Sequence, residues 1–217
     1  MDPLHFCIAI VPLSVYLLML GLLNLRRRPF VTTGARDIAA LGVGVVGFII
    51  AGPMELFFPE SAASQFGAWV WVMLLVFYGL CISLIVLLMR SRIVIYNVSM
   101  EKLRPALTMV AMEMDRKSRW AGDSLIIPSV GVHLHAEPVR WLRNVQLTAV
   151  GHDQSQEGWM TLEIELEKAL EKIPVGSNLI GVPFISISVL LAIFTACLLY
   201  TSPSPRDLST SRMPSSA

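Results

Sequence analysis

The chain has 217 residues, of which 54% are hydrophobic and 15% are charged, and its formal net charge is +1. A soluble domain carries about 25% charged residues, so this composition, with a mean hydropathy of +0.64, argues against a soluble protein. The near-neutral charge argues against a nucleic-acid partner, because nucleic-acid-binding proteins carry a basic face. Three cysteines are too few for a disulfide framework.

Three long apolar stretches fill the first part of the chain. A helix that crosses a bilayer needs about 20 predominantly apolar residues. Residues 3–25, 38–58 and 64–89 meet this length. We therefore expect three transmembrane helices over these ranges.

Basic residues flank these stretches unevenly. Arginines follow the first and the third stretch, whereas the loop between the second and the third has Glu60 and no basic residue. Because loops rich in Lys and Arg remain in the cytoplasm, we expect a multi-pass protein of the cell inner (plasma) membrane. Its N-terminus would lie outside and residues 90–172 in the cytoplasm. The arginines that determine this topology are Arg26, Arg27, Arg28, Arg90 and Arg92.

The second stretch has small residues at helical spacing. Ala40, Gly44, Gly47 and Ala51 fall on one helix face, and such faces let membrane helices approach closely. The partner could be another span or a second copy of the chain. The glycines of this stretch also match GxGxxG, but no strand precedes them, so we interpret the pattern as helix packing rather than a dinucleotide site.

Glu55 is the only acidic residue within the expected spans. An ionisable side chain in a bilayer is a functional candidate by default, so Glu55 is a candidate for ion or substrate handling. Its place near the end of its span, after Pro53, leaves the alternative that it reaches the headgroup region.

Residues 93–172 hold most of the remaining charge and predict a small cytoplasmic α+β module. Several short segments are β-rich or alternate in polarity, as strands do, and two have apolar residues at helical spacing. We expect a mostly antiparallel sheet covered by two helices. The expected strands are 93–98, 119–121, 124–127, 130–136 and 144–150, and the expected helices are 100–115 and 159–173.

Histidines supply the metal candidates of this module. His133 and His135 are two residues apart, so a strand would point them to the same side, and His152 follows in a turn. Three imidazoles could bind zinc, and the alternative is that they are polar residues on a solvated strand face. Because no cysteine or glutamate stands at ligand spacing, we expect neither a metal nor another cofactor.

Residues 173–196 predict a fourth transmembrane helix that runs outward from the module. Residues 197–217, in contrast, resemble a translated sequencing adapter. Codons of a transposase mosaic end encode Cys197 to Ser202, and those of the following primer site encode Pro203 to Asp207. The resemblance implies that the natural sequence differs after Ala196, and the alternative is a disordered Ser/Pro-rich tail.

The remainder resembles uncharacterised bacterial polytopic membrane proteins with a small cytoplasmic domain. The resemblance lies in RRPFVTTGARD (27–37) and GPMELFFP (52–59) and implies no activity. The expected fold class is membrane α-helical, with four transmembrane helices and a small cytoplasmic α+β module.

For function, we expect a non-enzymatic, membrane-anchored interaction or sensing module. The alternative is a subunit of a small-molecule or ion transporter or channel, and a membrane enzyme comes third. Expected partners are the lipid bilayer and either a second copy of the chain or another membrane protein, but no nucleic acid.

Overall fold

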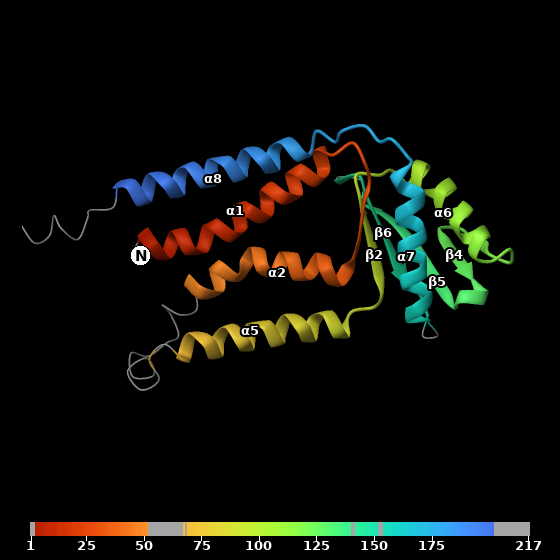
Figure 1. Cartoon of the computed structure of the whole chain (residues 1–217), viewed down its shortest axis with the longest axis horizontal. Helices are drawn as coiled ribbons and strands as arrows, with labels where there is room; N and C mark the ends of the chain where they lie inside the picture. Colours follow the sequence, from red (N-terminus) through yellow and green to blue (C-terminus); the bar gives the residue numbers. More distant parts are fainter. Residues whose placement is uncertain (1–2, 52–66, 68, 140–141, 152–153, 202–217) are drawn as a thin grey trace, which may run out of the picture.

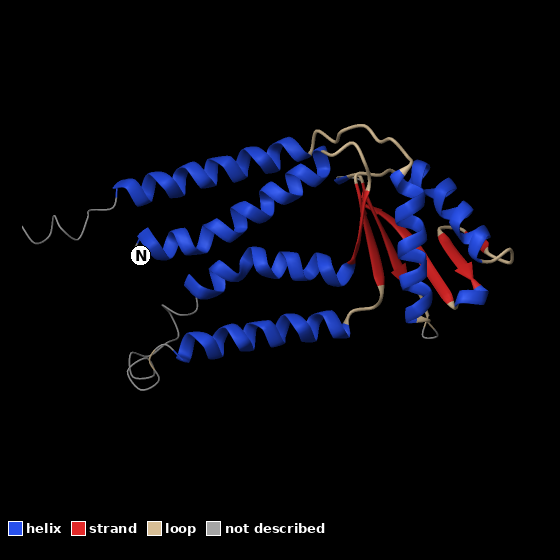
Figure 2. Ribbon diagram, in the orientation of Figure 1, coloured by secondary structure: helices blue, strands red, loops and turns tan. Residues whose placement is uncertain are grey.

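The computed structural model describes residues 3–51, 67, 69–139, 142–151 and 154–201. In this part of the chain, long apolar helices lie side by side and lead at one end into a sheet domain (Figure 1). Two amphipathic helices pack on the sheet, so the fold is a mixed α+β fold (Figure 2). The apolar helices are α1 (Pro3–Leu25), α2 (Gly34–Ala51), α5 (Trp69–Leu88) and α8 (Gly181–Thr201).

Helix α1 lies between α8 and α2 (Figure 1). Small residues allow the close approach to α8, because a side chain at Gly21 would lie 2.5 Å from Cγ1 of Ile185. At the far end of the same pair, the rings of Phe6 and Phe194 meet edge to face, with centroids 5.8 Å apart. Close packing of this kind stabilises helix pairs even where no hydrophobic effect acts between them.

The expectation of four transmembrane helices is wrong for the part of the chain that the structure describes. Three helices are long and apolar enough to cross a membrane, over Phe6–Leu25, Gly34–Ala51 and Gly181–Thr201. The expected third span, 64–89, instead contains α5, whose apolar stretch Val72–Leu88 is shorter than those of the other three helices. An uncharged stretch does not specify where its helix starts. Here Gly67 has φ of 52°, in the left-handed region that interrupts a right-handed helix.

The sheet has six strands in the order β1-β2-β6-β5-β4-β3, and every neighbouring pair is antiparallel. Gly122, with φ of 68°, forms the tight turn between the two shortest neighbours, β3 and β4. Such turns favour glycine because it has no Cβ. The strands are β1 (Phe30–Thr33), β2 (Arg92–Tyr96), β3 (Arg119–Ala121), β4 (Ser124–Ile127), β5 (Val132–Val139) and β6 (Asn144–Ala149).

Helices α6 (Met100–Met114) and α7 (Gln156–Glu171) cover one face of the sheet and close the main hydrophobic core. Leu103 and Leu107 of α6 are fully buried, as are Leu162 and Leu166 of α7. Each pair is four residues apart, so both members point to the same side of their helix. From Val132 to Ala136 in β5 burial alternates, and every second side chain enters the core.

The sheet is not confined to residues 93–172, where the sequence placed it. Strand β1 comes from the segment between α1 and α2, and it pairs with β2 with Phe30 opposite Tyr96. Val31 joins the core under α7 and α6. Four residues are too few to display an alternating pattern, and β1 forms because β2 offers it an edge. Two of the apolar helices are therefore joined through a strand of the sheet.

The last apolar helix also begins later than expected. The sequence predicted a helix from residue 173, whereas α8 starts at Gly181. Pro174 cannot continue the preceding helix because it lacks an N–H, and Ile173 packs against the sheet core instead. Helix α8 ends at Thr201, so its last turn lies within the segment that resembles an adapter.

Candidate functional site

The sheet domain and the apolar helices meet at a junction built from α2, α5, β2 and α7. Asp37, in the first turn of α2, accepts a hydrogen bond from the hydroxyl of Tyr96 at the end of β2. Its Oδ2 lies 3.8 Å from Nη2 of Arg92 at the start of β2, and both side chains are 24% exposed. One carboxylate of an apolar helix therefore holds both ends of a central strand. We call these three residues the Asp37 cluster.

Gly34 makes room for the Asp37 cluster. A side chain at this position would overlap Cγ and Nε of Arg92, so the arginine passes directly over the start of α2. Nε of Arg92 is buried and has no hydrogen-bond partner among the described residues. A buried donor without an acceptor costs about 1–3 kcal/mol, so the position of Arg92 over Gly34 carries an energetic cost.

The electrostatics of the cluster keep Tyr96 protonated. Burial raises the pKa of its hydroxyl far above the ordinary value of 10, and the hydrogen bond to Asp37 raises it further. The hydrogen bond requires the phenolic proton, because a carboxylate is only an acceptor. The cluster therefore keeps its hydrogen bond across the physiological pH range.

Ion pairs connect α7 to the ends of the apolar helices. Nη1 of Arg36, in α2, lies 3.1 Å from Oε1 of Glu163, whose side chain is 15% exposed. Arg28, just after α1, pairs with Glu171 at 3.8 Å, and both of these side chains are largely exposed. Exposed pairs contribute about 0–1 kcal/mol. The shorter, partly buried pair of Arg36 with Glu163 therefore contributes more to stability than the pair of Arg28 with Glu171.

Asparagine amides close the other side of the junction. Asn178, just before α8, donates from Nδ2 to the carbonyl oxygen of Leu142 at 3.0 Å, and its backbone N–H donates to the carbonyl oxygen of Asn24 at 3.1 Å. Nδ2 of Asn97, after β2, donates to the carbonyl oxygen of Arg26. These bonds join the end of α1 and the start of α8 to the loops of the sheet.

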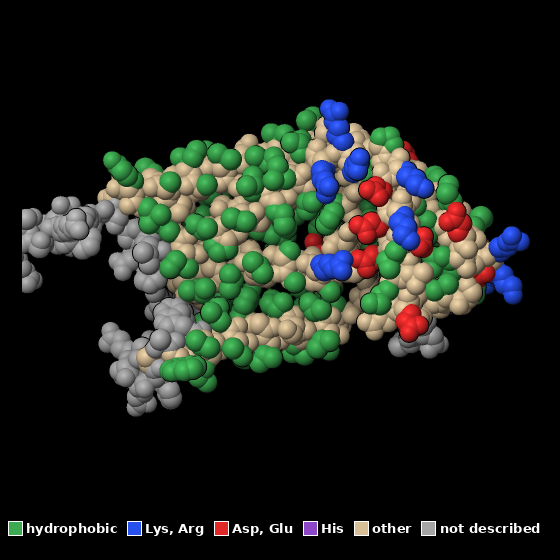
Figure 3. Space-filling model, viewed as in Figure 1, with side chains coloured by type: hydrophobic (Ala, Val, Ile, Leu, Met, Phe, Trp, Pro, Cys, Tyr) green, Lys and Arg blue, Asp and Glu red, His purple; other side chains and the backbone are tan. Residues whose placement is uncertain are grey.

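A cavity of about 600 Å³ opens at this junction. This size lies within the range of about 300–1,000 Å³ that is typical of small-molecule sites. Arg36, Arg90 and Arg92 line it together with the carboxylate of Glu163, and apolar walls come from the end of α5 and from α7. We call it the junction cavity. Charged side chains gather over the sheet domain and the adjoining helix ends, whereas the flanks of the helices are apolar (Figure 3).

All the arginines expected to determine topology lie at the sheet end of the apolar helices. Arg26, Arg27 and Arg28 follow the last residue of α1, while Arg90 and Arg92 follow α5. The sequence identified these residues by their charge alone. The structure adds that two of them line one cavity together with Arg36.

The small-residue face of α2 packs against α1 of the same chain. A side chain at Gly44 would lie 2.8 Å from Cβ of Tyr16, and one at Gly47 would lie 2.7 Å from the carbonyl oxygen of Ala9. Ala51 is buried beside the same helix, and Ala40 is half-buried. The sequence left open whether this face packs against another span or against a second copy of the chain. In the structure it packs against another helix of the same chain.

The histidines of β5 lie on the face of the sheet opposite α6 and α7, as the alternation predicts. His133 is half-buried, and Nδ1 of His135 lies 3.1 Å from Oγ of Ser124. In the part of the chain that the structure describes, no group of three or more His, Cys, Asp or Glu is placed to hold a metal ion. His152 and Glu55 lie outside the described residues, so their expected roles stay predictions.

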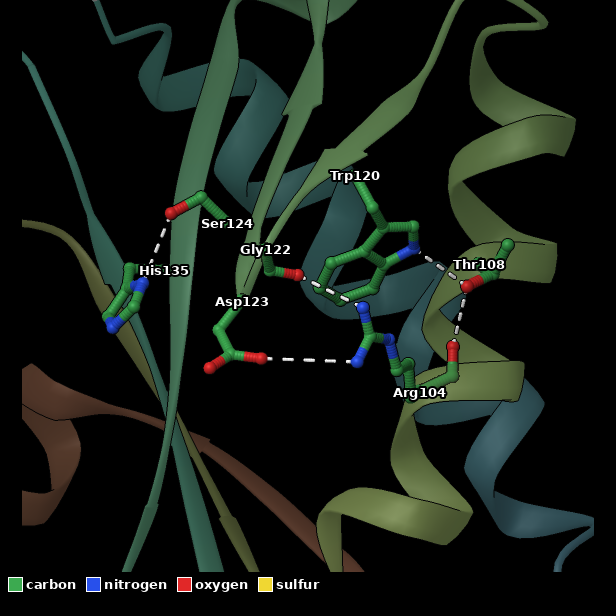
Figure 4. Close-up of polar contacts among 7 residues, drawn as sticks. All are labelled: Arg104, Thr108, Trp120, Gly122, Asp123, Ser124 and His135. Atoms are coloured by element: carbon green, nitrogen blue, oxygen red, sulfur yellow. Dashed lines mark hydrogen bonds and ion pairs between the residues drawn. The ribbon is translucent and has the colours of Figure 1, made fainter.

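A second polar cluster fastens α6 to the turn between β3 and β4 (Figure 4). The guanidinium of Arg104 stacks 4.8 Å from the ring centroid of Trp120 and donates to the carbonyl oxygen of Gly122 at 3.0 Å. Nε1 of Trp120 donates to Oγ1 of Thr108 at 2.9 Å. The cluster satisfies its own donors and acceptors, which suits it to holding the hairpin in place.

Sequence reasoning missed the residues that build the junction. Asp37 carried one signal, because an acidic residue in the first turn of an apolar helix stabilises the positive end of the helix dipole. Tyr96, Asn97 and Asn178 carried none, since their partners are far away in the chain. Comparison with protein-family models, with curated proteins and with solved structures finds no match to this chain. The candidate site is therefore defined by its geometry.

Proposed function

We propose that this chain is a membrane-anchored interaction or sensing module whose sheet domain lies at the cytoplasmic face of the cell inner membrane, as in the bacterial polytopic proteins it resembles. Three helices long and apolar enough to span a bilayer support the anchoring. The topology is supported by the arginines, which lie beside the sheet, and by the start of α1, which lies at the opposite end of the helices (Figure 1). The positive-inside rule puts the arginine-rich end in the cytoplasm.

The observation that carries the proposal is the Asp37 cluster. Side-chain contacts fix the sheet to the helices, because the carboxylate of Asp37 in α2 contacts residues at both ends of β2. Strand β1, between α1 and α2, is hydrogen-bonded to the same strand. A binding event on the sheet that shifts β2 would therefore act on α2, and a change in helix packing would act on the sheet.

Anchoring and topology can be tested by labelling single cysteines in a background without the native ones. In spheroplasts, a membrane-impermeant maleimide should label Asp2→Cys but not Lys117→Cys, which lies in an exposed turn after α6. Both should be labelled after lysis, and carbonate should leave the protein in the membrane. Labelling of Lys117→Cys in sealed spheroplasts would refute the topology, and carbonate extraction would refute the anchoring.

Coupling can be tested by amide hydrogen exchange of the chain in lipid nanodiscs. Asp37→Asn should speed exchange in β2 and in its neighbour β6, although the substituted residue lies in α2. Arg116→Gln, in the exposed turn after α6, is the control and should leave both strands unchanged. A change limited to α2 would contradict the proposed coupling.

We further propose that residues 197–217 derive from a sequencing adapter. Resequencing the gene with a library chemistry that uses no transposase adapter tests this. A sequence that differs after Ala196 is the expected result, and an identical sequence would refute the proposal.

A further inference from the structure

We propose that the junction cavity binds the phosphate group of an anionic phospholipid. The inference rests on the proposed membrane anchoring and names a ligand for the same junction. Three arginines line the cavity, and the only carboxylate among its described lining residues is Glu163. Guanidinium groups match the oxygens of a phosphate in charge and in hydrogen-bonding geometry.

The donors converge from separate elements. Arg90 follows α5, Arg92 starts β2, and Arg36 lies in the first turn of α2. The start of α2 lines the cavity as well, and the first turn of a helix favours anions because its backbone N–H groups point outward.

The acidic residues nearby leave part of this positive charge free. Glu163 faces Arg36 at 3.1 Å, and Asp37 faces Arg92 at the longer distance of 3.8 Å. Arg90 is exposed and forms no ion pair with any described residue. The lining thus has more positive than negative groups, and a phosphate would compensate the excess.

The apolar walls favour a lipid over a free phosphate. Val86 and Leu87, near the end of α5, line the cavity, and Leu87 is 80% exposed. Met160 of α7 lines it too and is also exposed. A phosphate bound by the arginines would therefore have apolar side chains of α5 beside it, where acyl chains of the same molecule can pack. The cavity lies at the helix ends, which is the level of headgroups for a helix that crosses a bilayer.

The experiment is a binding titration of the full chain in detergent micelles, in which native mass spectrometry measures the bound fraction. The probes are phosphatidylglycerol, phosphatidylcholine and inorganic phosphate. Phosphatidylglycerol should bind with the highest affinity. Arg90→Gln and Arg36→Gln should each weaken it about fivefold, because a basic residue near anionic lipid contributes on the order of 1 kcal/mol. Arg116→Gln removes the same charge in the exposed turn after α6 and should have no effect.

Each outcome decides the inference. Equal binding of the two lipids, or equal effects of Arg90→Gln and Arg116→Gln, would overturn it. Inorganic phosphate that binds as tightly as phosphatidylglycerol would assign the cavity to a soluble phosphate instead. Arg90 and Arg36 are exposed, so their variants are expected to fold, and Arg92→Lys provides a further variant that keeps the charge. Carbonate extraction tests the anchoring separately, so a protein that stays in the membrane without preferring anionic lipid refutes this inference alone.

Discussion

The Asp37 cluster makes a quantitative prediction, because one carboxylate takes part in two interactions. Replacing Asp37 by Asn keeps the shape of the side chain and removes its charge. Replacing Tyr96 by Phe removes the hydroxyl that donates to it. Together the two substitutions define a double-mutant cycle across the junction between α2 and the sheet.

The expected change in the free energy of unfolding depends on whether the acceptor at residue 37 is charged. A hydrogen bond to a charged group contributes about 1.5–3 kcal/mol, and a neutral one about 0.5–1.5 kcal/mol. Tyr96→Phe should therefore lower the free energy of unfolding by about 1.5–3 kcal/mol in the native background, and by about 0.5–1.5 kcal/mol when residue 37 is already Asn. The expected coupling energy is about 1 kcal/mol, within the range measured for residues in contact.

The free energy of unfolding can be measured by urea titration in detergent micelles, with tryptophan fluorescence as the signal. Trp120 and Trp159 pack in the sheet domain and report its unfolding. Tyr78→Phe is the matched control, because this hydroxyl bonds the carbonyl oxygen of Gly42 in α2 at 2.7 Å rather than Asp37. Its effect should add to that of Asp37→Asn within about 0.5 kcal/mol. A coupling of Tyr96 to Asp37 no larger than that of Tyr78 would refute the reasoning.

Three further predictions concern the sheet domain. The pKa of Tyr96 is raised above 10, so above that pH the folded state keeps a proton that the unfolded state loses. The stabilisation by this group should therefore be fully present and independent of pH below about 10, and the free energy of unfolding should fall as pH rises above it. Tyr96→Phe should make that decline shallower in alkaline urea titrations, and an unchanged slope would contradict the assignment. Backbone N–H groups of Lys117 and Ser129 lower the pKa of Asp115, so its stabilising effect should be present above pH 3.8 and be lost as pH falls below it. Asp115→Asn should accordingly lower the urea midpoint at pH 7 more than at pH 2, and equal shifts would argue against this role. Gly158→Ala would overlap the carbonyl oxygen of Val130 and approach Cγ2 of Val132 to 2.8 Å, so overpacking should cost about 1–3 kcal/mol in urea unfolding. Gly176→Ala, which meets no atom within 4 Å, should change stability by less than about 0.5 kcal/mol, and similar losses in both variants would count against the packing explanation.

Local patterns predicted much of the sheet domain. The alternation along β5 predicted a strand with His133 and His135 on the same side, because successive side chains of a strand point to opposite sides. Apolar spacing likewise predicted the buried faces of α6 and α7. These features depend on residues that are close together in the chain, and single-sequence reasoning can reach them.

Length and polarity were not sufficient to predict the bounds of the apolar helices or the residues of the candidate site. The uncharged stretch 64–89 suggested one continuous span, yet the helix begins at Trp69. From the sequence alone, no role was assigned to Asp37, because its role depends on Tyr96 and Arg92, which lie far along the chain. Composition cannot identify such pairings, because many sequences of the same polarity would place different residues in contact.

By itself, the sequence determined that the chain has long apolar helices, a charged α+β segment and arginines collected beside that segment, since each follows from local composition and period. Only the tertiary structure decided that residues 30–33 extend the sheet, that α1 covers Gly44 and Gly47 of α2, and that Arg36, Arg90 and Arg92 line one cavity. The physical reason is that these three features are made by contacts between distant segments. Their free energy comes from pairing and packing that no window of neighbouring residues contains.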